Sequence, residues 1–139
     1  MAEQRDRWRA RMDELVTQVA EWVEPNDWVT RPYPKRMRDS DGQVFEVPSL
    51  FLQKGPTRLL LDPIAYDAPG TEGIVDLYLM PTYDDMASLH LVEGRWKIHY
   101  VFPDQPAIDG TRQPEAMELS EETINRVLDE IACHAVPSV

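Results

Sequence analysis

The feature that most constrains the fold is a run of short apolar segments between residues 44 and 102, separated by turn signals. Within the segments, apolar and polar residues alternate, which is the period of a strand with one buried face. The expected strands are residues 44–52, 58–64, 74–80, 86–92 and 95–102. Glu93-Gly94 is the clearest of the turns, because two residues suffice for a hairpin. The sequence therefore predicts an antiparallel sheet of about five strands.

Two amphipathic helices are predicted, one on each side of this run. The first covers residues 3–24, where apolar residues recur at three- and four-residue spacing until Pro25. The second covers residues 120–135, with Ser120 as N-cap and glutamates in its first turn. Each helix has one apolar stripe, so we expect both to cover the same face of the sheet. The predicted fold class is α+β, in a single domain of residues 1–139.

The segments between these elements are predicted to be irregular. Residues 25–42 contain three prolines and several basic residues, and we interpret them as a linker that includes at most an edge strand. Residues 103–118 are acidic and contain proline, which indicates a surface loop. The sheet is therefore expected from about residue 35 to residue 102.

The formal net charge is −11 and is unevenly spread. Residues 1–38 hold eight Lys/Arg against seven Asp/Glu, which leaves six against eighteen for the rest of the chain. A field of this sign repels phosphate backbones, which argues against nucleic-acid binding except at the N-terminal basic positions. Four arginines lie on the polar side of the first helix, and the simplest interpretation is a solvated face, the alternative being an anion or partner site. They are Arg5, Arg7, Arg9 and Arg11.

Composition also indicates in which cellular compartment the protein is expected. The longest apolar stretches are far shorter than a membrane span, and no apolar segment follows the arginine-rich N-terminus as in a signal peptide. Cys133 is the single cysteine, so no internal disulfide is needed. We therefore expect a cytoplasmic protein without membrane contact.

A specific strand register follows if consecutive strands pair as simple hairpins. Ile64 would then face Ile74, Met80 would face Met86, and Val92 would face Arg95. One sheet face becomes wholly apolar in this register, with cross-strand rows that the helices would cover. The predicted rows are Leu61, Leu77, Leu89 and Ile98, then Leu59, Leu79, Ala87 and Tyr100, with Val75, Leu91 and Trp96 beside them.

The opposite face carries the candidate functional residues. One predicted row holds Asp62, Asp76, His90 and Lys97, and a neighbouring row holds Tyr78, Ser88 and His99. Two carboxylates directly across a strand pair repel each other unless a cation, a shared proton or a flanking charged group compensates. A divalent ion held by Asp62, Asp76 and His90 is one explanation, and acid/base chemistry at His90 is another. The alternative is that this is the solvent-exposed face of the sheet, where side chains of opposite charge pair with one another across the strands.

The first hairpin leaves two registers open. A four-residue turn after Leu52 places Phe45, Val47 and Phe51 on the polar face, and a five-residue turn places them in the core. Glu46 joins Asp62 and Asp76 on one face only in the second case. Three acids on three strands would resemble the metal site of restriction-endonuclease-like nucleases, but that family has a lysine two residues after the last acid. Position 78 is Tyr, so the sequence does not assign the chain to that family.

These observations lead to three hypotheses of function. The first is a small, acidic, non-catalytic protein-binding module of the immunity-protein, chaperone or adaptor type, because apolar side chains also fall on the polar face. They are Leu60, Ile64, Ile74, Met86, Val92 and Val101. Either the loop at 103–118 or another chain, including a second copy, would cover them. In size, charge and α/β make-up the chain is similar to the acidic chaperones of bacterial secretion systems, although no residue motif carries that likeness.

The second hypothesis is a metal-assisted hydrolase, with Asp62, Asp76 and His90 around the ion and Lys97 stabilising developing negative charge. Tyr78 and His99 are further candidates for catalytic groups. The third is a small-ligand domain with its pocket between sheet and loop. No nucleotide or other organic cofactor is predicted, since the glycines form no phosphate-binding pattern.

Overall fold

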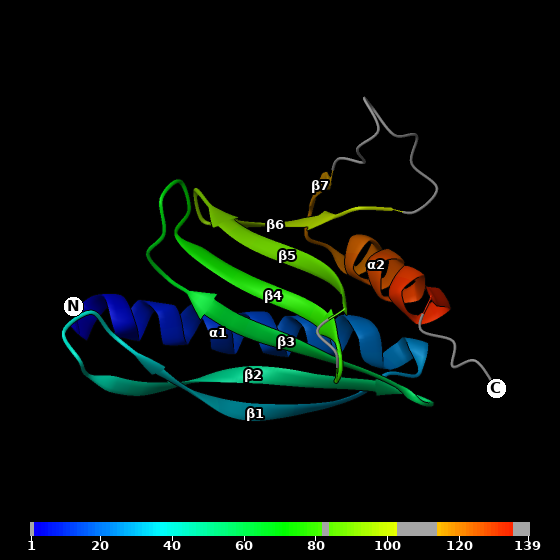
Figure 1. Ribbon diagram of the computed structural model, residues 1–139, viewed down its shortest axis with the longest axis horizontal. Coiled ribbons are helices and arrows are strands. Elements are labelled where there is room, and N and C mark those ends of the chain that lie inside the picture. The colour runs from blue at the N-terminus through cyan, green and yellow to red at the C-terminus, as the bar shows by residue number, and fades with distance from the viewer. Residues whose placement is uncertain (1, 82–83, 103–113, 135–139) are drawn as a thin grey trace.

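The structure is a computed structural model that describes residues 2–81, 84–102 and 114–134. It has the predicted α+β architecture, with an N-terminal helix, a C-terminal helix and an antiparallel sheet (Figure 1). The helices are α1 (Ala2–Val23) and α2 (Glu121–His134), with a short 3-10 turn, η1 (Glu24–Asn26), after α1. The strands are β1 (Val29–Arg38), β2 (Val44–Lys54), β3 (Thr57–Ala65), β4 (Gly73–Leu79), β5 (Asp84–Val92), β6 (Arg95–Tyr100) and β7 (Glu115–Glu118).

Over the described residues the sheet has seven strands, where about five were expected. Its spatial order, β1 to β7, is the order along the chain, so each strand pairs with the next one. The two additional strands lie at the two edges and come from the segments interpreted as linker and acidic loop. The acidic segment 103–118 thus ends in a strand, and its residues 103–113 lie outside the described part.

Prolines explain why β1 was expected as at most an edge strand within a linker. Pro32 and Pro34 lie inside it, and proline has no N–H to donate in a sheet ladder. An edge strand needs donors on one side only, and β1 pairs with β2 alone. β7 is missed for a different reason: Glu-Ala-Met-Glu has the composition of a helix or loop, and its pairing with β6 makes it a strand.

Both helices cover the same side of the sheet, as predicted. Their apolar stripes and one face of the strands form one hydrophobic cluster. The Ser120 hydroxyl caps α2, accepting a bond from the Thr123 N–H at 3.2 Å. Asn125 ties the helices together, since its side-chain amide donates to the Trp22 carbonyl at 3.0 Å. Neither described helix combines the length and apolarity needed to cross a bilayer.

The first hairpin follows neither of the two registers in full. Its turn, Gly55-Pro56, is shorter than either alternative, and Phe51 opposite Leu60 lies away from the helices. Phe45 and Val47 are nevertheless buried in the core, because the alternation of β2 changes phase between Ser49 and Leu50, which are both buried. Only Leu50–Lys54 pairs with β3. The rest of β2 curves with β1 toward the start of α1.

The register between β4 and β5 differs from the prediction by two residues. A bulge lies between Leu77 and Leu79, and Leu79 pairs with Asp84, so Met80 does not face Met86. A shift of two residues leaves every side chain on its predicted face, since side chains alternate with period two. It changes the rows: Leu89 is opposite Val75 rather than Leu77. The β5–β6 hairpin has the predicted register, with Val92 opposite Arg95.

Candidate functional site

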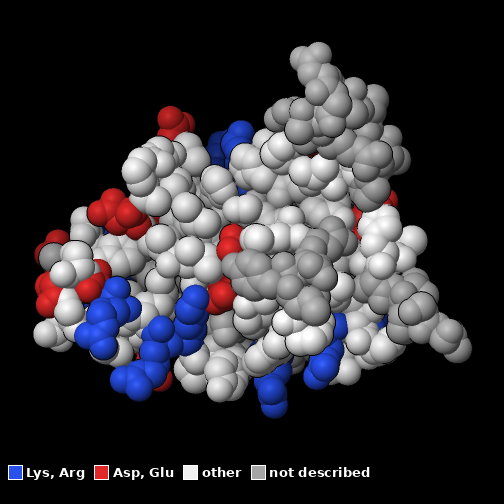
Figure 2. Space-filling model, in the orientation of Figure 1, with Lys and Arg blue, Asp and Glu red and all other residues white. Residues whose placement is uncertain are grey.

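We call the side of the sheet that faces away from α1 and α2 the open face. Strand pairing and alternation put a mixed set of side chains there. The described side chains on it include Val29, Arg31, Tyr33, Lys35, Phe51, Gln53, Arg58, Leu60, Asp62, Ile64, Ile74, Asp76, Tyr78, Met86, Ser88, His90, Val92, Arg95, Lys97, His99, Val101 and Glu118. Figure 2 shows this face, with basic side chains along the β1 margin and a little acidic surface near the centre.

Asp62 and Asp76 lie directly opposite each other on β3 and β4, as predicted. Asp62 has a counter-ion that the sequence did not reveal. The Lys35 ammonium, from β1, donates to Asp62 Oδ1 at 2.7 Å and to the Pro63 carbonyl at 2.6 Å. The Tyr78 hydroxyl donates to the other carboxylate oxygen at 3.2 Å. The chain itself therefore supplies a cation for the carboxylate that seemed to require one.

His90 is not in the row of the two carboxylates. It lies opposite Ile74 and Lys97, whereas Ser88 and then His99 continue the row from Asp76. The imidazole of His90 is 2.8 Å from the Ser88 hydroxyl, and its ring centre is 4.5 Å from that of His99. Burial, and next the charge of His90, lower the pKa of His99 below its usual value. The predicted residues thus form two groups, one around Asp62 and one around His90.

No three His, Cys, Asp or Glu side chains among the described residues come together as a metal site. Glu46 is on the part of β2 that does not pair with β3, so it does not extend the row of Asp62 and Asp76. Lys97 lies opposite His90, as predicted, and its ammonium is 3.7 Å from the Glu118 carboxylate. Both of these charged groups are largely exposed, so the pair contributes little stability.

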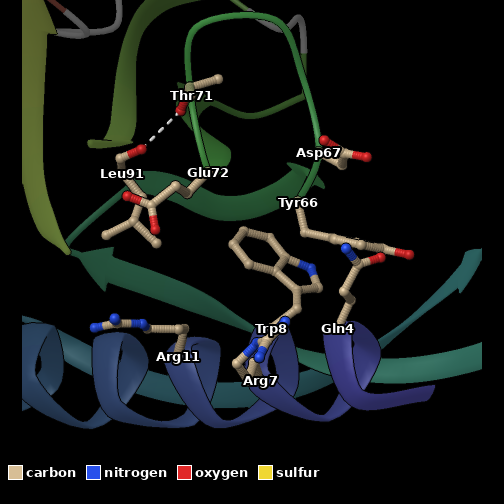
Figure 3. Close-up of a pocket in the computed structure, with 9 residues that line it drawn as sticks. All are labelled: Gln4, Arg7, Trp8, Arg11, Tyr66, Asp67, Thr71, Glu72 and Leu91. Atoms are coloured by element: carbon tan, nitrogen blue, oxygen red, sulfur yellow. Dashed lines mark hydrogen bonds between the residues drawn. The ribbon is translucent and has the colours of Figure 1, made fainter. Parts of the chain in front are cut away.

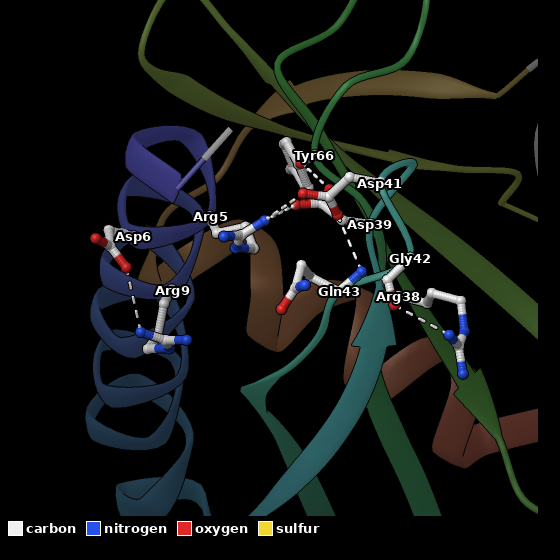
Figure 4. A network of polar contacts seen from close by, with 9 residues as sticks. All are labelled: Arg5, Asp6, Arg9, Arg38, Asp39, Asp41, Gly42, Gln43 and Tyr66. Atoms are coloured by element: carbon white, nitrogen blue, oxygen red, sulfur yellow. Dashed lines mark hydrogen bonds and ion pairs between the residues drawn. The ribbon is translucent and has the colours of Figure 1, made fainter.

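A second polar cluster joins α1 to the β1–β2 turn (Figure 4). The Arg5 guanidinium is 2.8 Å from the Asp39 carboxylate and 3.2 Å from that of Asp41. The Tyr66 hydroxyl, from the end of β3, donates to the other Asp39 oxygen. Arg5 was expected on a solvated face, but its side chain is only 18% exposed and the Asp39 side chain 3%. This part of the arginine run is structural.

The charges of this cluster shift two pKa values in opposite directions. The bond from Tyr66, followed by that from Arg5, holds the pKa of Asp39 below its usual value. The bond to Asp39 raises the pKa of Tyr66 to about 12. Both groups are therefore kept in the form that favours the hydrogen bond, a carboxylate and a neutral phenol.

A small cavity of about 270 Å³ lies beside this cluster, between α1 and the loop after β3 (Figure 3). Trp8 forms one wall of it, and Arg7 and Arg11 flank Trp8 along the helix. Asp67 and Glu72 stand on the loop side, so cationic and anionic walls face each other. The mixed charge gives this cavity no preference for a ligand of one sign.

Replacing Lys35 with methionine is expected to lower the free energy of unfolding by about 1–2 kcal/mol, since a bond to a charged group is lost. Asp62 would keep a side chain that is only 13% exposed and would still accept a hydrogen bond from the Tyr78 hydroxyl. Urea unfolding measures the difference. Lys97→Met is the matched control, because it removes an exposed ion pair on the same face and should cost close to nothing. Equal losses in the two variants would contradict the role given to Lys35.

Comparison of the chain with protein-family models, with curated proteins and with solved structures finds no match.

Proposed function

We propose that this chain is a non-catalytic protein-binding module that contacts its partner through the open face. The observation that carries the proposal is apolar exposure on a sheet face that no described helix or strand covers. Met86 is 42% exposed, Ile64 39%, and Val92 and Val101 38% each. They are the side chains that the sequence had placed there. An apolar surface of this kind on a folded domain is typical of an interaction site.

The edges of the sheet favour contact through this face over the addition of a strand. β1 presents Pro32 and Pro34, which break the row of donors that an incoming strand would need. β7 is only four residues long and has glutamate at both ends. A partner would therefore meet side chains of the open face. An immunity protein, a chaperone or an adaptor would each use such a face, and the free cysteine Cys133 fits a reducing, cytoplasmic setting.

Site-specific crosslinking in the producing cells tests the proposal. A photoreactive amino acid at Met86 or His90 is expected to give one discrete crosslinked product, which mass spectrometry identifies. The control carries it at Gln18, which is exposed on α1, on the other side of the molecule. The identified protein should then bind the purified chain, and Met86→Lys should weaken that complex by about tenfold or more, as for a residue near the centre of an interface. Products from Gln18 alone, or none, would contradict the proposal.

A metal-assisted hydrolase is the second candidate, favoured by the direct opposition of Asp62 and Asp76. His90 and Lys97 would then act beside the ion, with Tyr78 and His99 nearby. Thermal unfolding with and without Mg²⁺, Mn²⁺ or Zn²⁺ decides between the two, because an ion that binds the folded chain stabilises it. We expect no shift, because the Lys35 ammonium already lies against Asp62. A shift that Asp76→Asn removes would favour the hydrolase.

A further inference from the structure

One end of the open face is hollowed where β1, β2 and β3 run side by side. The hollow has a volume of about 480 Å³. Val29, Phe51 and Met80 give it apolar walls, and Val29 is 71% exposed, the highest value among the large apolar side chains that the structure describes. Arg31 and Arg58 also line it. The hollow thus combines apolar surface with two cations.

Neither of these arginines forms an ion pair with a carboxylate that the structure describes. The guanidinium of Arg31 lies over the Phe51 ring instead, 5.5 Å from its centre. The hollow therefore holds two such arginines in a chain with 25 Asp/Glu against 14 Lys/Arg. A guanidinium over an aromatic ring keeps N–H groups available for a carboxylate.

Two of the other basic side chains of β1 have partners within the chain. Lys35 is bound to Asp62, and Arg38 donates to the Gly42 carbonyl. Among the described charged side chains of the open face, bases exceed acids by five to three, opposite in sign to the whole chain. The bases are Arg31, Lys35, Arg58, Arg95 and Lys97, and the acids are Asp62, Asp76 and Glu118.

We infer that this hollow receives an acidic segment of the protein partner, with a carboxylate between Arg31 and Arg58 and an apolar side chain against Val29, Phe51 and Met80. The inference rests on the proposed function and adds the chemistry of the partner. A nucleic acid is disfavoured because a net charge of −11 repels its backbone. A second copy would have to present a different, acidic surface, and such a head-to-tail contact does not close into a dimer.

A designed peptide tests the inference without knowledge of the natural partner. The probe is a capped peptide of sequence Glu-Glu-Phe-Glu-Glu-Leu, and the readout is the NMR signals of the arginine side-chain Nε–H groups. We expect the signals of Arg31 and Arg58 to move on titration with the peptide and the signal of Arg95 to stay. The same peptide with glutamine in place of glutamate should bind weakly, and added salt should weaken the acidic peptide further.

The double variant Arg31→Gln/Arg58→Gln is expected to weaken binding of the acidic peptide by about tenfold or more, since it removes two charge-assisted contacts. Arg36→Gln/Arg95→Gln is the matched control: it removes the same charge from exposed positions outside the hollow and should change affinity little. If both double variants weaken binding equally, the net charge of the chain alone explains the effect, and the inference is overturned.

Three further outcomes would also overturn it. They are tighter binding of single-stranded oligothymidine than of the peptide at the same arginines, self-association that the arginine double variant abolishes, and no shift at Arg31 and Arg58. The crosslinks at Met86 and His90 do not involve these arginines. If the crosslinks form but the acidic peptide does not bind, only the inference of an acidic segment is contradicted. If the crosslinks do not form, the proposed function itself is contradicted.

Discussion

Replacing Gly73 with alanine is expected to destabilise the protein by about 3 kcal/mol, since overfilling a packed core costs this much. A Cβ atom at Gly73 would lie 2.5 Å from Cζ3 and 3.0 Å from Cη2 of the Trp8 ring. Distances this short require one of the two residues to move. Gly73 is the first residue of β4, and its N–H donates to the Thr71 hydroxyl at 3.1 Å.

Trp8 has little room to move. It is 2% exposed, its indole N–H donates to the Met37 sulfur at 3.5 Å, and its ring contacts Tyr66 and Trp96. The clash therefore strains three elements, α1, β1 and β4, rather than one side chain. Urea unfolding of the native chain and of Gly73→Ala measures the loss.

A double-mutant cycle separates the clash from any general effect of alanine in a strand. Trp8→Leu removes the ring atoms that the new methyl group would meet, so Gly73→Ala should cost little in the Trp8→Leu background. The expected coupling between the two positions is about 2 kcal/mol or more, the size seen for residues in direct contact. If the two losses simply add, the close approach of Gly73 to Trp8 is not what makes glycine necessary there.

The cluster of Asp39, Arg5 and Tyr66 is expected to make stability fall at both ends of the pH range. Because the pKa of Asp39 is lower in the folded chain, its contribution is present above the unfolded value, near 3.8, and is lost as pH falls further through the folded value. Tyr66 works in the opposite direction. Its folded pKa of about 12 exceeds the ordinary tyrosine value of 10.0, so its contribution is present below pH 10 and is lost between pH 10 and 12.

Thermal unfolding measured across the pH range tests both the acid and the alkaline loss of stability. Asp39→Asn should lower the melting temperature at neutral pH and remove the part of the acid limb that belongs to this carboxylate. Tyr66→Phe should lower the free energy of unfolding by about 1 kcal/mol at neutral pH, because the hydrogen bond is lost. Above pH 10 the stability of the native chain and that of the variant should become more alike. Asp41→Asn is the control, because Asp41 is the more exposed partner of Arg5. A control with the same loss as Asp39→Asn would contradict the role of the buried carboxylate.

The sequence was sufficient for the helices and for the face on which each central strand residue lies. Faces are robust because a register shift by two residues preserves them, as the β4–β5 bulge illustrates. The same shift changes which residues lie opposite each other: His90 lies opposite Ile74, and not opposite Asp76 as predicted. Any site predicted from cross-strand rows therefore depends on the exact hairpin turns and bulges, and the sequence did not indicate the bulge between Leu77 and Leu79.

The parts that sequence reasoning missed depend on contacts between distant segments. Lys35 reaches Asp62 only because β1 pairs with β2 and the ribbon curves over the sheet, and nothing local to either residue indicates it. Asp39 falls in the segment 25–42 that was interpreted mainly as a linker, and it is buried because Arg5 and Tyr66 enclose it. The change of phase at Ser49 and Leu50 follows Pro48, which is the one local signal that β2 is not a regular strand.

The order of the strands has a consequence for synthesis of the chain. Because each strand pairs with its predecessor, the sheet can grow one strand at a time as the polypeptide leaves the ribosome, and such local pairing favours rapid folding. Closure of the core is the non-local step. α2 is the last described element, and its Asn125 bonds to Trp22, 103 positions earlier. The part of the core between α1 and α2 is therefore completed last, and until then its apolar side chains on α1 are open to aggregation.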